Sequence, residues 1–161
     1  MHSEHAIAQH EHDRTPQQVS WAMAAQATLH CLTGCAIGEV LGMVSGTSIG
    51  LHDGATVALS VALAFLFGYA LTMRGVLRAG VPFRAAVRVA LAADTVSIFV
   101  MEVVDNAIML GVPGAMEAGI ASVLFWVALA AALAVAFVVT LPINRALMSR
   151  GKGHAVVHAL H

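Results

Sequence analysis

Apolar residues dominate four long stretches of this chain, and polar residues gather between the stretches and at both ends. The stretches cover residues 19–50, 55–73, 85–110 and 119–141. Each exceeds the roughly 18 apolar residues that indicate a helix crossing a lipid bilayer. Glycine and proline are found in the short connectors, as is typical of turns. The pattern predicts an all-α integral membrane protein, a bundle of four helices.

Composition supports the same interpretation. Of 161 residues, 59% are hydrophobic and only 11% are charged, whereas a soluble domain is about 25% charged. The length suits one domain. We therefore expect a histidine-rich tail over residues 1–18, a transmembrane domain over 19–145 and a second tail over 146–161.

The cations predict the orientation of the bundle. All eight Lys and Arg residues fall on one side of the four-helix layout: Arg14, Arg74, Arg78, Arg84, Arg88, Arg145, Arg150 and Lys152. Cytoplasmic loops of membrane proteins are enriched in Lys and Arg, so both termini are predicted to be cytoplasmic. The arginines of the second connector are also expected to contact lipid headgroups.

A ladder of glycines runs along the first stretch. It comprises Gly34, Gly38, Gly42, Gly46 and Gly50, one at every fourth residue, and Gly54 continues the spacing. Because glycine has no side chain, a neighbouring helix can approach closely. The ladder predicts tight packing against another helix of the chain or of a second copy, and we expect a homo-oligomer.

A stripe of metal-type ligands lies beside the ladder. Cys31, Cys35, Glu39 and Met43 repeat at four-residue intervals, so they share one helical face with a drift of about 40° per step. His30 lies one position off this stripe.

The third stretch carries a second polar set. Asp94, Met101, Glu102, Asp105 and Met109 fall within about 100° of helical arc, and Asn106 lies at its edge. A carboxylate in mid-bilayer costs on the order of 3 kcal/mol, so such residues are functional candidates. If the first and third helices pack in parallel, Cys31 lies near the depth of Asp94, Cys35 matches Ile98, and Glu39 matches Glu102.

Thiolate and thioether ligands favour Cu(I), and thiolate with imidazole and carboxylate also suits Zn(II). We therefore predict a protein that binds or translocates a copper or zinc ion. The expected ligands are His30, Cys31, Cys35, Glu39, Asp94, Glu102 and Asp105, with polar support from Asn106, Met43 and Met101. Asp94 would mark the cytoplasmic entrance.

Other functions fit the same residues. The carboxylates alone could serve a proton- or cation-coupled transporter of a small solute, or the polar stripe could bond to a partner's helix in an assembly factor. A membrane enzyme would need a metal with an open coordination position. No phosphate loop, serine nucleophile pattern, HExxH or nucleic-acid module is present, so no catalytic residue is predicted and nucleic acid is not expected as a partner.

Leu32-Thr33-Gly34-Cys35 matches the bacterial lipobox, in which the cysteine is lipidated after cleavage. The segment before it argues against a signal sequence, because it is acidic and histidine-rich, with Arg14 as its only cation.

Histidines are concentrated in both tails, at His2, His5, His10, His12, His154, His158 and His161. Histidine-rich tracts bind metals. Both tails are predicted on the side where a cytosolic metal donor would deliver an ion.

Three segments, HCLTGCAIGEVLGM, ALAADTVSIFVMEVVDNAIML and RGKGHAVVH, resemble a family of small bacterial membrane proteins known as domain of unknown function 4396. The resemblance covers residues 27–158 and implies a helical inner-membrane protein. It also implies that a set of polar residues belongs to the family motif: His30, Cys31, Cys35, Glu39, Asp94, Glu102, Asp105 and Asn106. It implies no activity.

Overall fold

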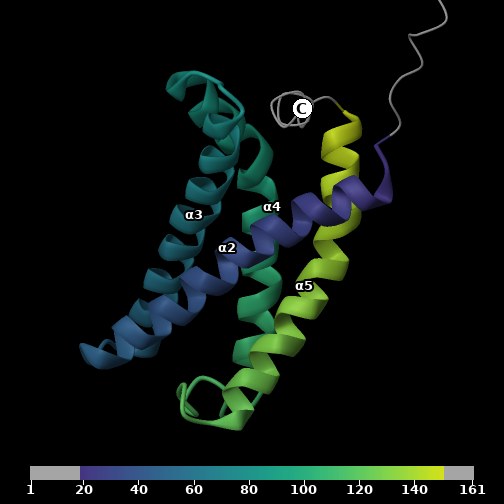
Figure 1. Cartoon of the computed structure of the whole chain (residues 1–161). Coiled ribbons are helices and arrows are strands. Elements are labelled where there is room, and N and C mark those ends of the chain that lie inside the picture. The colour runs from purple at the N-terminus through teal and green to yellow at the C-terminus, as the bar shows by residue number, and fades with distance from the viewer. Residues whose placement is uncertain (1–18, 151–161) are drawn as a thin grey trace, which may run out of the picture.

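In a computed structural model that describes residues 19–150, the chain forms four long helices (Figure 1). They are α2 (Trp21–Ser48), α3 (Asp53–Arg78), α4 (Phe83–Gly111) and α5 (Val123–Ser149). The predicted all-α four-helix bundle is confirmed. The helix ends differ by a few residues, and α5 continues past Pro142 and past residue 145, where the transmembrane domain was predicted to end. The histidines predicted to form tails lie in 1–18 and 151–161, outside the described residues.

Side chains just before three of the helices bond to their first turns. Ser20 accepts from the backbone N–H of Met23, His52 from that of Ala55, and Ser122 from that of Leu124. Each bond satisfies one of the N–H groups that a helix start leaves without a partner. The capping explains why the helices begin just after the polar connector residues.

Three of the described helices, α2, α3 and α5, are long and apolar enough to cross a membrane. Many large apolar side chains on their surfaces are exposed, such as Leu66 at 59% and Val127 at 60%. Polar residues lie inside instead. This inverted arrangement suits a lipid solvent, in which intramembrane polar side chains face the bundle interior.

The remaining helix, α4, was also predicted to span. It has 29 residues, or about 43 Å at 1.5 Å per residue, which is long enough to cross a membrane. It contains more charged residues than the other three helices, so it is not among those apolar enough by composition. Those charges are segregated on the helix. Leu91, Phe99 and Val103 are exposed, whereas the three carboxylates are buried. The outer face of α4 is therefore as apolar as the outer faces of its neighbours.

The glycine ladder of α2 packs against α3. A Cβ atom added to Gly34 would lie 2.7 Å from the Cα of Gly68, and one added to Gly38 would overlap the backbone at Ala64. Gly42 faces Ser60 and Gly46 faces Thr56 in the same way. The two backbones approach so closely that no side chain fits between them, which is the role of small residues at membrane helix interfaces.

The partner surface on α3 is itself a ladder of small buried residues, Thr56, Ser60, Ala64, Gly68 and Thr72, again at every fourth position. Gly50 does not join the interface, which corrects the prediction for that residue. It lies in the turn after α2 with a φ of +72° and has open space where a Cβ would be. Glycine is suited to that turn because it adopts positive φ without steric penalty.

Charge separates the two ends of the bundle. The α3–α4 connector and the C-terminal end of α5 lie together at one end (Figure 1). That end carries all six described arginines, Arg74, Arg78, Arg84, Arg88, Arg145 and Arg150, whereas Asp53 and Glu117 lie at the opposite end. Arg145 of α5 also joins the start of α2: its Nε donates to the carbonyl of Val19 at 3.2 Å, and its guanidinium lies 4.2 Å from the centre of the Trp21 ring.

Candidate functional site

The predicted ligand stripe of α2 faces the interior. Cys31, Cys35, Glu39 and Met43 are all buried, and none is more than 5% exposed. They lie on the same side of α2 as α4, whose buried polar residues are Asp94, Ser97, Glu102 and Asp105. The sequence left open whether the first and third helices touch, and in the structure they do. Together they form a polar column between α2 and α4.

The first pair of the column joins Cys31 and Asp94. The Cys31 thiol donates a hydrogen bond to Oδ1 of Asp94 at 3.5 Å. The Asp94 carboxyl also lies beside Thr72 of α3. Its second oxygen, Oδ2, is buried with no hydrogen-bond partner. One oxygen of this carboxyl is therefore hydrogen-bonded, while the other is buried without a hydrogen-bond partner.

The second pair joins Cys35, which is 2% exposed, and Glu102, which lies beside it. Asn106 orients Glu102 from one turn further along α4. Its Nδ2 donates to Oε2 of Glu102 at 3.4 Å and to the Glu102 carbonyl at 2.8 Å. Asn106 is half-buried, so it lies at the edge of the column, as its sequence position predicted.

The third pair consists of two carboxyl groups. Glu39 lies beside Asp105, and the Asp105 side chain is 2% exposed. Neither carboxyl oxygen of Asp105 has a hydrogen-bond partner. Burying a carboxylate without a partner is strongly unfavourable. A cation or a shared proton between Glu39 and Asp105 would remove that penalty.

Three buried methionines pack along the column. Met43 and Met109 belong to one buried apolar cluster with Phe125 of α5, and Met101 packs in another with Cys31 and Cys35. Only Met101 among these is next to the thiols. Packing accounts for all three.

The pairing agrees with the sequence prediction at Cys31 and Asp94 and differs in register for the next two pairs. Cys35 lies beside Glu102 instead of level with Ile98, and Glu39 lies beside Asp105 instead of Glu102. The reason is that α2 crosses α4 obliquely (Figure 1). Equal residue counts from the membrane surface then no longer correspond to equal depth.

His30 was predicted as a primary ligand, and this stays a prediction. His30 is exposed, one residue before Cys31, and successive residues of a helix point about 100° apart. It therefore lies off the face of the cysteines, although it is near enough to Asp94 for its charge to act on that carboxyl. Within residues 19–150, no three His, Cys, Asp or Glu side chains converge tightly enough to hold one ion, and the ligand types meet in pairs.

A second buried polar network, which was not predicted from the sequence, lies next to the Cys31 end of the column. Asn144 of α5 donates from Nδ2 to the Thr28 hydroxyl of α2 at 2.8 Å. The Ser97 hydroxyl of α4 donates to Oδ1 of the same amide. One side chain therefore connects three helices. Thr28 lies three residues before Cys31 and so falls on the same helical face. Asn144 is polar within an apolar stretch, so both residues could have been recognised in the sequence.

Comparison with known families agrees with this architecture. The sequence model described as domain of unknown function (DUF4396) matches residues 20–153. The chain belongs to this family. The match covers all four helices and every residue of the polar column. No curated protein and no solved structure matches the chain.

Proposed function

We propose that this protein binds a soft transition-metal cation, copper or zinc, in the polar column between α2 and α4 and passes it along that column through the membrane. The observation that carries the proposal is the pairing of each buried thiol with a buried carboxyl of α4. Thiolates select soft metals, and the carboxyl groups can supply the remaining negative charge and accept protons.

The chemistry of binding is a proton exchange. A thiol must lose its proton to ligate a metal. Cys31 already directs its S–H toward Asp94, so Asp94 is placed to receive that proton. With the proton on Asp94, the Cys31 thiolate would offset one positive charge of the cation, and the neutral Asp94 carboxyl could still offer it an oxygen. Sites built of two groups favour copper(I), because structural zinc is almost always bound by four ligands. Zinc would need further ligands from water or a second copy of the chain.

The column also supplies a route. Cys31 and Glu39 are separated by eight positions on α2, or about 12 Å along the helix. A cation moving along this line would pass from the Cys31–Asp94 pair to the Cys35–Glu102 pair and then to the Glu39–Asp105 pair. The Cys31–Asp94 pair lies nearest the arginine-rich end, in keeping with the predicted role of Asp94 at the cytoplasmic entrance.

The proposed location is the inner membrane of a bacterium, with several membrane crossings and both termini in the cytoplasm. The concentration of arginines at one end of the bundle supports this orientation. Association into a homo-oligomer and delivery of the ion by a cytosolic metal donor belong to the same proposal.

Elemental analysis tests the proposal directly. The untagged protein is purified in detergent under reducing conditions and measured beside Cys31→Ser/Cys35→Ser and a control, Thr33→Ser, on the exposed side of α2. We expect stoichiometric copper or zinc in the unmodified protein and the control, and its loss in the double variant. No bound metal in the unmodified protein, even after reconstitution with copper(I) and zinc, would contradict the proposal.

A proton- or cation-coupled transporter of a small solute is the second candidate, and the Glu39–Asp105 pair favours it. Two adjacent buried carboxyl groups can hold one proton between them, because both cannot easily be ionised at once. Transport in proteoliposomes separates the candidates. A metal carrier loses transport with Cys31→Ser/Cys35→Ser, whereas a proton-coupled carrier keeps it and loses transport with Asp105→Asn.

A further inference from the structure

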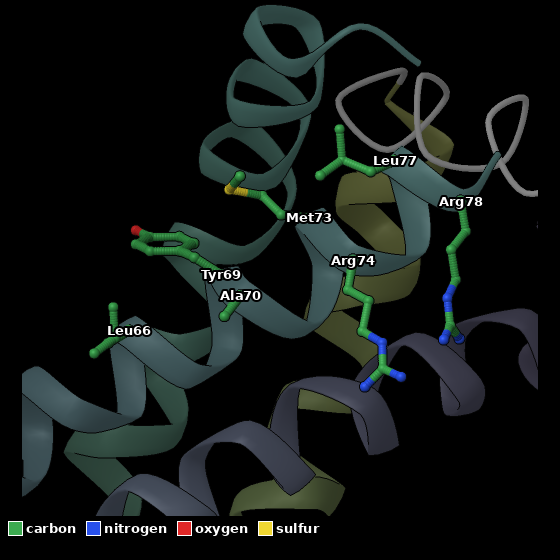
Figure 2. A pocket seen from close by; sticks show the side chains of 7 residues that line it. All are labelled: Leu66, Tyr69, Ala70, Met73, Arg74, Leu77 and Arg78. Atoms are coloured by element: carbon green, nitrogen blue, oxygen red, sulfur yellow. The ribbon is translucent and has the colours of Figure 1, made fainter. Parts of the chain in front are cut away.

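An open groove lies on the outer surface of α3, away from the polar column. It has a volume of about 570 Å³ and is lined by a strip of α3 that ends at two arginines (Figure 2). Leu66 lies at its apolar end and Leu77 lies beside the arginines, and these side chains are 59% and 40% exposed. Met73 lines the wall between them. The groove faces outward, where the proposed bilayer would be.

The walls of the groove are fixed by contacts within the bundle. The Tyr69 hydroxyl is hydrogen-bonded to the Thr95 hydroxyl of α4 at 2.9 Å. The Tyr69 ring also packs against Phe65, with ring centres 5.8 Å apart. Ala70 lies among the larger lining side chains, and its small side chain leaves space at the floor of the groove. The groove is therefore a preformed feature of the α3–α4 surface.

The charged end has a defined geometry. Arg74 and Arg78 are one helical turn apart and extend side by side from α3 (Figure 2). Both are exposed. Four further arginines lie at the same end of the bundle, and the described acidic residues nearest the surface lie at the other end. A pair of parallel guanidinium groups is suited to phosphate oxygens.

The apolar part of the groove is long enough to hold part of one acyl chain. Residues 66–73 rise by roughly 10 Å, which is about two-thirds of the roughly 15 Å of half of a bilayer's hydrocarbon core. A lipid lying along the strip would place its acyl chain against Leu66, Ala70 and Met73. Its headgroup would then lie at the level of Arg74 and Arg78.

We propose that this groove is a binding site for an anionic phospholipid, with its phosphate held by Arg74 and Arg78 and one acyl chain lying along the apolar strip of α3. The paired arginines and the apolar strip beside them both select this ligand. A zwitterionic lipid offers less net charge to the arginines, and a free phosphate leaves the apolar strip unused. The site is separate from the polar column, and its test does not depend on the proposed metal binding.

Native mass spectrometry of the full chain in detergent tests the site, with phosphatidylglycerol and phosphatidylcholine of identical acyl chains as probes. We expect preferential retention of phosphatidylglycerol. Arg74→Gln/Arg78→Gln should weaken that binding by about thirtyfold, since each cation near an anionic lipid contributes about fivefold. Arg84→Gln/Arg88→Gln is the matched control, because it removes the same charge from the same end without touching the groove, and it should keep the preference.

Three outcomes would overturn the proposal. One is equal retention of the two lipids by the unmodified protein. Another is equal loss in the two double variants, which would indicate attraction to the whole charged end. The third is displacement of phosphatidylglycerol by glycerol phosphate as readily as by the lipid itself, which would mean that the strip contributes nothing. Ala70→Trp provides a separate check, since it fills the groove, leaves both arginines in place and should abolish the preference.

Discussion

The Cys31 thiol and the Asp94 carboxyl meet across the α2–α4 interface, with Sγ donating to Oδ1 at 3.5 Å although the residues are 63 positions apart in the chain. This contact aligns the polar face of one helix with that of another. Two further pairs follow it toward the middle of the bundle. Its consequences for binding and stability can be tested separately.

Asp94→Asn keeps the size of the side chain and an oxygen that can accept from Cys31, but it removes the negative charge. We expect loss of at least half of the bound metal with little change in the melting temperature, because the amide still accepts from Cys31 and a buried carboxylate without a counter-ion is itself unfavourable. Elemental analysis and thermal unfolding in detergent measure the two effects. Asp53→Asn, at the exposed start of α3, is the control, and equal metal content in both variants would argue against a role for Asp94.

Gly38→Ala should destabilise the bundle by about 1–3 kcal/mol, because the new methyl group overlaps the α3 backbone at Ala64 and backbone cannot move aside easily. Gly111→Ala is the matched control, since a Cβ there meets open space. The free energy of unfolding in mixed micelles, titrated with a denaturing detergent, reports the difference. If the two variants are equally stable, the close approach of α2 and α3 is not maintained in the folded protein.

Thr28 and Asn144 are expected to be coupled. A double-mutant cycle with Thr28→Val and Asn144→Leu should give an interaction energy of about 0.6 kcal/mol, which is typical of hydrogen bonds between membrane helices. Thr33 bonds to its own helix through Leu29 just as Thr28 bonds through Ala24, but it is exposed. A cycle of Thr33→Val with Asn144→Leu should therefore give no coupling, and coupling of similar size in both cycles would count against the bond.

The orientation of the bundle can be read from cysteine labelling in a Cys31→Ser/Cys35→Ser background. Glu117→Cys, in the α4–α5 connector, should react with a membrane-impermeant maleimide in intact cells. Ala79→Cys, in the arginine-rich connector, should react only after the membrane is permeabilised. The reverse pattern would place the arginine-rich end outside and contradict the predicted topology.

Much of the architecture follows from local sequence features. Apolar length predicts the helices, and the four-residue spacing of Gly34 to Gly46 predicts a close helix neighbour, because both depend only on helical geometry. The sequence alone also placed Cys31, Cys35 and Glu39 on one face. The facing ladder on α3, from Thr56 to Thr72, has the same spacing and could have been recognised as the partner.

Tertiary structure decided which residues meet. The oblique crossing of α2 over α4 is set by how the glycine ladder packs against α3, and it pairs Cys35 with Glu102 and Glu39 with Asp105. The same packing brought Asn144 of α5 to Thr28. The sequence by itself determined what each helix carries on each face, because the helical repeat is local. The partners across the interfaces depend on crossing angles, and those arise only when side chains of all four helices pack together.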